Sequence, residues 1–518
     1  ERAGERAGRA VVRGEFREHK VDVLALGMLT AIRKSFDLFN AYRGTSMTIA
    51  HIPPEDPLTY KMLQTGDSVG VFQVESRAQM SMLPRLKPKT FYDLVIEVAI
   101  VRPGPIQGNM VHPYLKRRSG EEPVTYANDA VRGVLERTLG VPIFQEQVIK
   151  LAVVAAGFTP GEADQLRRAM AAWKRRGGLE VFEEKLVQGM LERGHEREFA
   201  ERIFEQIKGF GEYGFPESHA ASFALLVYIS AWIKRYEPAA FYCGLLNSQP
   251  MGFYSPSQLV QDAHRHDIEI RPVDVLYSAW ESTLEKPTYR NGQLTSQQPA
   301  LRLGMNRIKG MREDAAQRIV LARERRTFKD VPDLSRRSRL DRGELARLTE
   351  GGALKTLSGH RHETHWQAQG LLPEAPLFPV NDGAQGTGPG DGRSTGADAG
   401  KGTGTDAPNQ GDPIRRVAEP SQGYGERVEL PAPSENDDLG ADYSSLGLTL
   451  GRHPMAILRD SGGPFRHCRK ADDLPNLRHG CFIQVAGIVT GRQRPGSASG
   501  VIFLTLEDET NNINVVIW

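Results

Sequence analysis

Apolar residues recur at helical spacing along roughly half of this 518-residue chain, and this periodicity dominates the predicted fold. In residues 28–42 they lie three or four positions apart, at Leu29, Ile32, Phe36 and Phe39. Comparable patterns continue to about residue 270, where the composition shifts. We predict a large helical block within a multidomain α+β chain that is mainly α, because a single core stops growing well short of this length.

A short apolar stretch at 20–27 precedes the block and predicts a buried strand that breaks at Gly27. Side chains alternate along a strand, which sets Lys20 and Asp22 on one face and apolar residues on the other. Such a pair is more often a solvated edge or a local ion pair than part of a catalytic site. Residues 1–19 repeat Glu-Arg-Ala-Gly without apolar periodicity, and we expect a frayed or foreign leader there.

Cysteine usage and hydropathy indicate the setting of the chain. Cys243, Cys468 and Cys481 lie far apart without paired spacing, which argues against a disulfide scaffold or a zinc site. No apolar run reaches the length of a membrane span, and the charged start does not resemble a signal peptide. We therefore expect a cytoplasmic protein with no membrane partner.

The formal net charge of +2 hides an uneven distribution of charge. Basic clusters occur at 116–118, 174–176 and 323–329. Residues 379–433 are rich in Gly, Asp, Thr, Ser and Pro with almost no aliphatic content, which predicts a disordered linker. The preceding Pro376-Leu377-Phe378 could be a partner-binding peptide or simply the end of a domain.

A helix start is predicted at Thr159-Pro160-Gly161-Glu162, where Thr159 can cap the helix and Glu162 completes a capping box. The following helix should bury a stripe formed by Ala163, Leu166, Met170 and Trp173. Arg167 and Arg168 flank this stripe. Two adjacent guanidinium groups on a rigid helix suit a polyphosphate, although a solvated charged face is the commoner use of such a pair.

A glycine- and aromatic-rich loop at 210–219 leads into an apolar helix over 220–234. Ser218 and His219 then lie at a helix N-terminus, where free N–H groups and the helix dipole favour an anion. A helix cap is the plainer alternative and is compatible with phosphate binding. A catalytic Ser-His pair is disfavoured, because sequence neighbours are poorly placed for proton transfer and no G-x-S-x-G elbow is present.

Residues 303–311, followed by 312–323, predict a helix-hairpin-helix. The hairpin Ile308-Lys309-Gly310 would let backbone N–H groups approach a DNA phosphate, with salt-sensitive affinity and no base specificity. A poorer copy lies at 340–354. A plain pair of antiparallel helices is the alternative, but the arginines between 323 and 342 favour phosphate binding.

The segments 481–490 and 501–518 show the alternating pattern of strands around a turn at 494–497. Together with the motifs above, they make the chain resemble the bacterial C-family DNA polymerases, the family of the polymerase III α subunit. The segments that carry the resemblance in order and spacing are 20–30, 71–77, 102–105, 144–148, 166–170 and 211–225. Residues 21–29, 173–179 and 492–498 are more similar to the error-prone branch than to the replicative one.

The resemblance implies a metal-dependent nucleotidyltransferase. In the family a palm strand carries the third of three metal-binding aspartates, which matches Asp22, with Lys20 directed at the incoming nucleotide. Two Mg²⁺ ions would assist attack of a primer 3′-hydroxyl on the α-phosphate of a dNTP. The implied partners are primer-template DNA and dNTPs, with translesion or replisome proteins and a sliding clamp as further candidates.

The resemblance also assigns contacts outside the palm. The positions that match family residues facing the triphosphate are Arg167, Arg168, Ser218 and His219. Arg102, in the stiff turn 101–105, and Lys174 are weaker candidates for nucleotide or DNA backbone contact. The final strands resemble the start of the family's OB-fold, a barrel that commonly binds single-stranded nucleic acid.

The chain also departs from the family pattern. The other two aspartates belong to a Pro-Asp-x-Asp segment, which is absent from 1–19. We therefore expect a carboxy-terminal part that begins within the palm and is inactive alone; a DNA-binding fragment and a replicative α subunit are the alternatives. The predicted domains are a palm remnant at 20–30, fingers at 31–270, a helix-hairpin-helix region at 271–378 and a truncated OB-fold with its leading segment at 434–518.

Overall fold

The computed structural model describes residues 26–102, 110–176, 180–209, 216–251, 254–290, 293–294, 296–370, 430–494 and 501–518. The predicted leader, the strand residues 20–25 and most of the predicted linker lie outside these ranges. The predicted break at Gly27 is wrong, because Gly27 lies in the first turn of the helix Leu26–Arg43. The mainly helical fold is confirmed.

The central part of the structure is a helical block built around α12 (Glu217–Tyr236). α4 packs along α12, and α1 packs along α13, so the apolar faces of these helices close one core. The block comprises α1 (Leu26–Arg43), η1 (Ile49–His51), α2 (Pro57–Gln64), α3 (Arg77–Leu86), α4 (Phe91–Ile100), α6 (Val111–Ser119), α12, α13 (Pro238–Leu246) and α14 (Pro256–Arg265).

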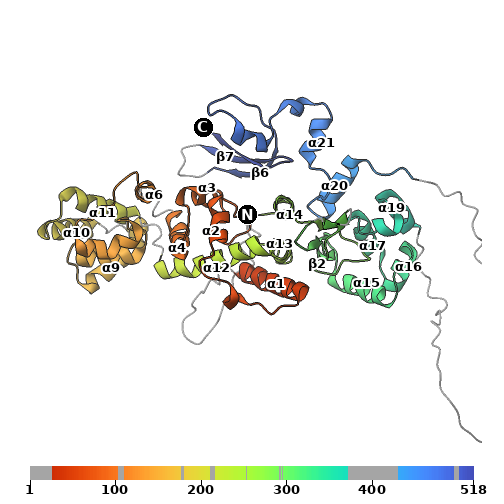
Figure 1. The fold of residues 1–518 in the computed structure, drawn as a ribbon, viewed down its shortest axis with the longest axis horizontal. Coiled ribbons are helices and arrows are strands. Elements are labelled where there is room, and N and C mark those ends of the chain that lie inside the picture. Colours follow the sequence, from red (N-terminus) through yellow and green to blue (C-terminus); the bar gives the residue numbers. More distant parts are fainter. Residues whose placement is uncertain are drawn as a thin grey trace, which may run out of the picture.

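A second group of helices forms a lobe at one end of the molecule, at the left of Figure 1. α9 packs on α8, and α10 pairs with α11. The lobe comprises α7 (Asp129–Leu135), η2 (Glu136–Thr138), α8 (Gln145–Val154), α9 (Pro160–Arg176), α10 (Glu180–Glu192) and α11 (Arg197–Gly209). The N-terminal end of α12 points toward this lobe (Figure 1), so the lobe and the start of α12 are neighbours.

The opposite end holds a small sheet and the predicted helix-hairpin-helix region. In the sheet, β5 pairs parallel with β1 and antiparallel with β2. The first helix of the predicted motif is a single 3₁₀ turn, η3. The elements are β1 (Ile270–Arg271), β2 (Thr283–Glu285), β3 (Tyr289–Arg290), β4 (Gln293–Leu294), β5 (Ala300–Arg302), η3 (Met305–Arg307), α15 (Glu313–Arg325), α16 (Val331–Ser338), α17 (Arg342–Glu350), α18 (Lys355–Ser358) and α19 (Arg361–Gln369).

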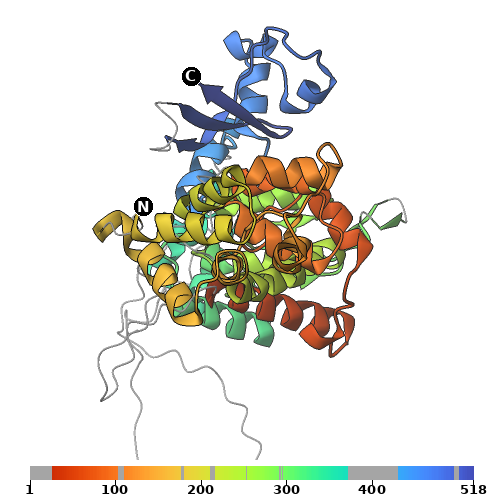
Figure 2. The same cartoon turned by 90° about the vertical axis from the view of Figure 1, so that its left-hand side faces the viewer.

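The last part of the chain carries an antiparallel sheet in the order β6-β7-β8, which stands above the helical block in Figure 2. It meets the block at α3, where Gly491 leaves room for the Arg77 guanidinium. Three strands are consistent with the start of an OB-fold, which stays a prediction. The elements are α20 (Glu435–Ser445), α21 (Pro454–Asp460), η4 (Pro464–His467), η5 (Ala471–Asn476), β6 (Ile488–Gln493), β7 (Ile502–Glu507) and β8 (Asn512–Ile517). In the described ranges, none of the helices combines the length and apolarity needed to cross a bilayer.

Candidate functional site

Helix α9 begins as the sequence predicts. The Thr159 N–H donates to Glu162 Oε2 at 3.0 Å, and the Glu162 N–H donates to Thr159 Oγ1 at 3.3 Å, which forms the capping box. Ala163, Leu166 and Met170 are fully buried. The helix is therefore anchored by its cap and by its apolar stripe; the side chains of Trp173 and Lys174 lie outside the described part.

The two arginines on α9 share one carboxylate. Arg167 Nη2 lies 2.9 Å from Asp164 Oδ1, and Arg168 Nη2 lies 2.8 Å from Asp164 Oδ2. The hydrogen bond from Arg167 is the main cause that holds the pKa of Asp164 below its ordinary value. The side chain of Arg168 is 73% exposed, and that of Arg167 is 42% exposed. One excess positive charge and several free N–H directions therefore remain available to an anion.

The N-terminus of α12 is capped by a neighbouring helix. The Glu217 N–H donates to Glu146 Oε2 of α8 at 2.9 Å, whereas Pro216 supplies no side-chain cap. Glu217 Oε1 in turn accepts a hydrogen bond from the Tyr92 hydroxyl at 2.8 Å. Ser218, the plainer candidate for a cap, is exposed in the first turn. The position of this turn is thus set by contacts from α4 and α8.

Removal of this cap gives a measurable prediction. We expect Glu146→Ala to weaken the first turn of α12 by about 1 kcal/mol, because the Glu217 N–H loses its acceptor. Hydrogen exchange at Glu217 should therefore become several-fold faster, with no change at the C-terminal end of α12. Glu146→Gln keeps an acceptor oxygen and serves as the control. If hydrogen exchange at Glu217 became equally faster in both variants, Glu146 would not be the cap of α12.

The His219 ring is oriented by aromatic neighbours. Its centroid lies 4.2 Å from that of Phe223, which packs edge-on against Phe72 at 5.2 Å. Arg102 lies at the end of α4, where its Nη2 donates to Gln73 Oε1 at 2.6 Å and its Nε donates to the Val98 carbonyl at 3.2 Å. The structure thus holds both candidate side chains in defined positions before any ligand binds.

The hairpin Ile308-Lys309-Gly310 agrees only in part with the prediction from the sequence. Gly310 has φ +76°, in the region that favours glycine. Ile308 is buried against Gly351, so its side chain serves the core of the hairpin. The Lys309 N–H donates to the Ser445 carbonyl of α20 at 2.8 Å.

Several arginines of the hairpin region make internal ion pairs, among them Arg326, Arg336 and Arg337 of the group expected to face phosphate. Glu344 accepts from Arg312 Nη2 at 2.7 Å and from Arg318 Nη2 at 2.9 Å. Asp333 is surrounded in the same way by Arg326, Arg336 and Arg337. These contacts stabilise the packing of α15, α16 and α17. Asp333 alone faces three guanidinium groups, and the side chains of Arg326 and Arg336 are more than half exposed, so an excess of positive charge remains there.

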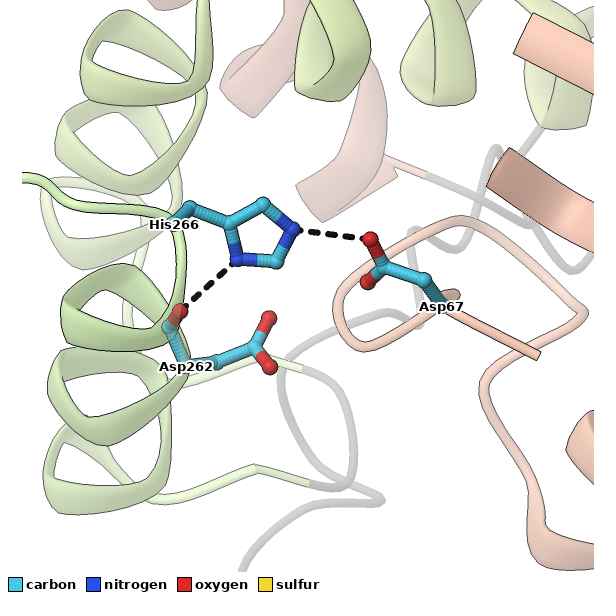
Figure 3. Close-up of side chains that lie close together, drawn as sticks. All are labelled: Asp67, Asp262 and His266. Carbon is cyan, nitrogen blue, oxygen red and sulfur yellow. Dashed lines mark hydrogen bonds and ion pairs between the residues drawn. The ribbon is translucent and has the colours of Figure 1, made fainter. Parts of the chain in front are cut away.

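A buried polar cluster that the sequence did not reveal lies in the helical block (Figure 3). Asp67, Asp262 and His266 bring potential metal-binding atoms within 4.8 Å of one another. Lys234 Nζ, fully buried on α12, lies 2.6 Å from Asp67 Oδ1 and 2.9 Å from Asp262 Oδ2. It also donates to the Val69 carbonyl at 3.1 Å. The ammonium group supplies the cation between the two carboxylates, so the cluster is a buried ion network rather than a metal site.

The surroundings of His266 favour its protonated form. Its Nε2 faces Asp67 Oδ2 at 2.8 Å, and its Nδ1 lies 2.8 Å from the Asp262 carbonyl and 3.0 Å from the Tyr242 hydroxyl, so an acceptor lies beside each ring nitrogen. Burial, the largest single cause, opposes this charge, but the hydrogen bond to Asp67, the negative charge of Asp67 and the Asp262 carbonyl together raise the pKa of His266 above its ordinary 6.5. The protonated ring therefore contributes to stability.

The raised pKa gives the sign of a pH dependence. The stabilisation by His266 is complete below the unfolded pKa and is lost as the pH rises through the higher folded pKa. Hydrogen exchange, corrected for intrinsic rates, gives the opening free energy of α14 in wild type and in His266→Gln. We expect the opening free energy to be higher in wild type, and the difference to be larger near pH 6 than near pH 9. A difference that grows with pH would contradict the imidazolium.

Comparison with known proteins supplies the context for these groups. The chain is 56% identical over 499 residues to the error-prone DNA polymerase of Alkalilimnicola ehrlichii and 56% identical over 499 residues to that of Pseudomonas aeruginosa. That of Methylococcus capsulatus is 52% identical over 510 residues. Residues 28–194 match the bacterial DNA polymerase III alpha subunit finger domain, and residues 267–364 match a helix-hairpin-helix motif. The chain belongs to the bacterial C-family DNA polymerases.

The coverage of these matches is uneven. They include 96% of this chain but 44% or 45% of each relative, so the chain spans less than half of the length of these polymerases. Within the C-family finger match lie Arg102, Arg167 and Arg168, whereas Ser218 and His219 follow it. Lys20 and Asp22 lie outside both the finger match and the described residues, and their roles stay predictions.

Proposed function

We propose that this chain supplies the fingers and DNA-binding hairpins of a DNA-directed DNA polymerase that adds dNTPs to a primer 3′ end, in error-prone synthesis during repair or across template lesions. The observation that carries the proposal is the pair of solvent-accessible arginines, one half-buried and one exposed, on the anchored helix α9, within the finger-domain match. The similarity to error-prone DNA polymerases supports the error-prone class rather than the replicative one. Such an enzyme would act on DNA in the bacterial cytoplasm.

The described residues provide groups for triphosphate binding. Arg167 and Arg168 can exchange their shared Asp164 carboxylate for phosphate oxygens, because guanidinium N–H groups bind both in the same fork geometry. Ser218 and His219 would add the first turn of α12, whose dipole favours negative charge. Fixed donors at these positions would stabilise the charge that develops on the leaving pyrophosphate.

The metal chemistry would lie at the palm. Asp22 would hold Mg²⁺ together with carboxylates supplied by a Pro-Asp-x-Asp segment, and Lys20 would face the nucleotide. When bound, two such ions activate the primer 3′-hydroxyl and neutralise the leaving group. A sliding clamp and other translesion or replisome proteins are further proposed partners; Pro376-Leu377-Phe378, the candidate peptide for such contact, lies outside the described residues.

A chimaera tests the proposed function. This chain would replace the matching 44% of the Alkalilimnicola polymerase, and extension of a labelled primer would be followed with Mg²⁺ and dNTPs. We expect extension on intact template and opposite an abasic site. Primer-template binding without extension, by a folded chimaera whose parent is active, would favour a DNA-binding role alone.

A further inference from the structure

Helix α20 rests on the first predicted DNA-binding hairpin. The Ser445 carbonyl, at the C-terminal end of α20, accepts the Lys309 N–H at 2.8 Å. The Ser445 hydroxyl donates to the Glu350 carbonyl at 3.1 Å. Glu350 directly precedes Gly351-Gly352, the glycine pair of the second predicted hairpin in residues 340–354. A hairpin amide that could bind a DNA phosphate therefore already has a protein acceptor.

The acidic face of α20 also engages the cations beside the second hairpin. Asp438 Oδ2 lies 3.1 Å from Lys355 Nζ, and Asp438 also pairs with Arg361. Arg361, which is 8% exposed, forms a second ion pair with Asp442. These cations lie against the hairpin itself, because a Cβ on Gly352 would be 3.0 Å from Arg361 Nη2 and 3.4 Å from Lys355 Cε.

The chemistry of these contacts matches that of a nucleic-acid backbone. Proteins bind DNA phosphates without sequence preference through backbone N–H groups and nearby Lys and Arg side chains. α20 offers those same groups a carbonyl oxygen and two carboxylates. One helix thus reaches both hairpins, and Figure 1 shows it lying between the hairpin region and the C-terminal sheet.

We propose that α20 is an internal competitor of DNA, whose carbonyl and carboxylate oxygens occupy the hairpin surface that takes backbone phosphates, so that DNA displaces it. The proposal rests on the proposed DNA-binding role of the hairpins. Its partner is a nucleic-acid backbone, recognised by charge. Because α20 belongs to the same chain, it competes at an effective concentration on the order of millimolar, which lowers apparent DNA affinity.

Charge-neutralising variants of the full chain test the competition. Asp438→Asn with Asp442→Asn removes two acids from Arg361, while the control pair, Glu198→Gln with Glu201→Gln, removes two acids from α11, in the lobe at the other end of the molecule. We expect the first pair to bind a labelled DNA duplex about tenfold more tightly than the control pair by fluorescence anisotropy. Its affinity should also fall more steeply with salt, because about two more cations contact phosphate.

Hydrogen exchange in the unaltered chain provides a second readout that does not depend on how the variants fold. Saturating duplex should accelerate exchange in residues 435–445 and slow it in the hairpins. Equal affinity of the two variant pairs, or DNA that protects α20, would overturn the competition while leaving the hairpins as DNA contacts. Absence of DNA binding by every variant at low salt would remove both the hairpin role and the competition, whereas primer extension by the chimaera would report on the polymerase role separately.

Discussion

Replacement of Lys234 by alanine should lower the opening free energy of α12 by about 3 kcal/mol, because it removes the buried cation that Asp67 and Asp262 share and leaves only His266 beside Asp67 and Arg265, at 3.5 Å, near Asp262. Lys234 is fully buried and contacts Asp67 and Asp262 directly. An uncompensated buried charge costs more than the ion pair contributes, which is why loss of one partner has a large effect. Hydrogen exchange is the suitable measurement, since a chain of several domains need not unfold in one step.

Two further variants separate this mechanism from loss of side-chain volume. Asp262→Asn added to Lys234→Ala removes one stranded charge and should recover part of the stability. Lys61→Ala, at an exposed lysine lining the adjoining hollow, should change the opening free energy by less than about 0.5 kcal/mol. If Lys234→Ala and Lys61→Ala had similar effects, the cluster would not be a buried ion network. Addition of EDTA should leave the unaltered chain unchanged.

Alanine at Arg167 or Arg168 should reduce kcat/KM for dNTP incorporation by the chimaera about 10²-fold, because a fixed donor to the reacting phosphates is lost. Lysine at either position keeps the charge but loses the planar fork, so it should restore only part of the rate. The measurement is single-nucleotide extension of a primer over a range of dNTP concentrations.

A matched control is available in the same lobe. Arg197 on α11 forms an exposed pair with Glu201, four residues along its helix, as Arg168 does with Asp164. Arg197→Ala should change incorporation less than about twofold, since exposed pairs of this kind contribute little. Equal losses at Arg168 and Arg197 would show that the lobe tolerates no charge change, and would contradict a specific role in triphosphate binding.

The start of α9 was predictable because its determinants are local. Thr159 and Glu162 are three residues apart, and the buried stripe follows helical periodicity. The strand was predicted to continue to Gly27, but Leu26 and Gly27 belong to α1. A short apolar run fits a strand or a helix end equally well, so the sequence pattern did not separate the two.

Features that depend on distant segments could not be predicted. Lys234 stands beside Arg235 in the last turn of an apolar helix, and its partners Asp67 and Asp262 lie 167 and 28 positions away. The cap of α12 comes from Glu146, on a helix that sequence alone does not place beside it. Arg318 on α15 pairs with Glu344 on α17, 26 positions along the chain, a contact that the sequence pattern did not indicate.

The most direct test of the account is to map where the triphosphate lies. A dNTP carrying an aryl azide on its γ-phosphate would be photolysed with the chimaera and primer-template DNA, and labelled peptides identified by mass spectrometry. We expect labelling of α9 and of the first turns of α12, and we expect excess unmodified dNTP to abolish it. Labelling that is abolished by excess dNTP but lies only outside α9 and α12 would contradict this position of the triphosphate.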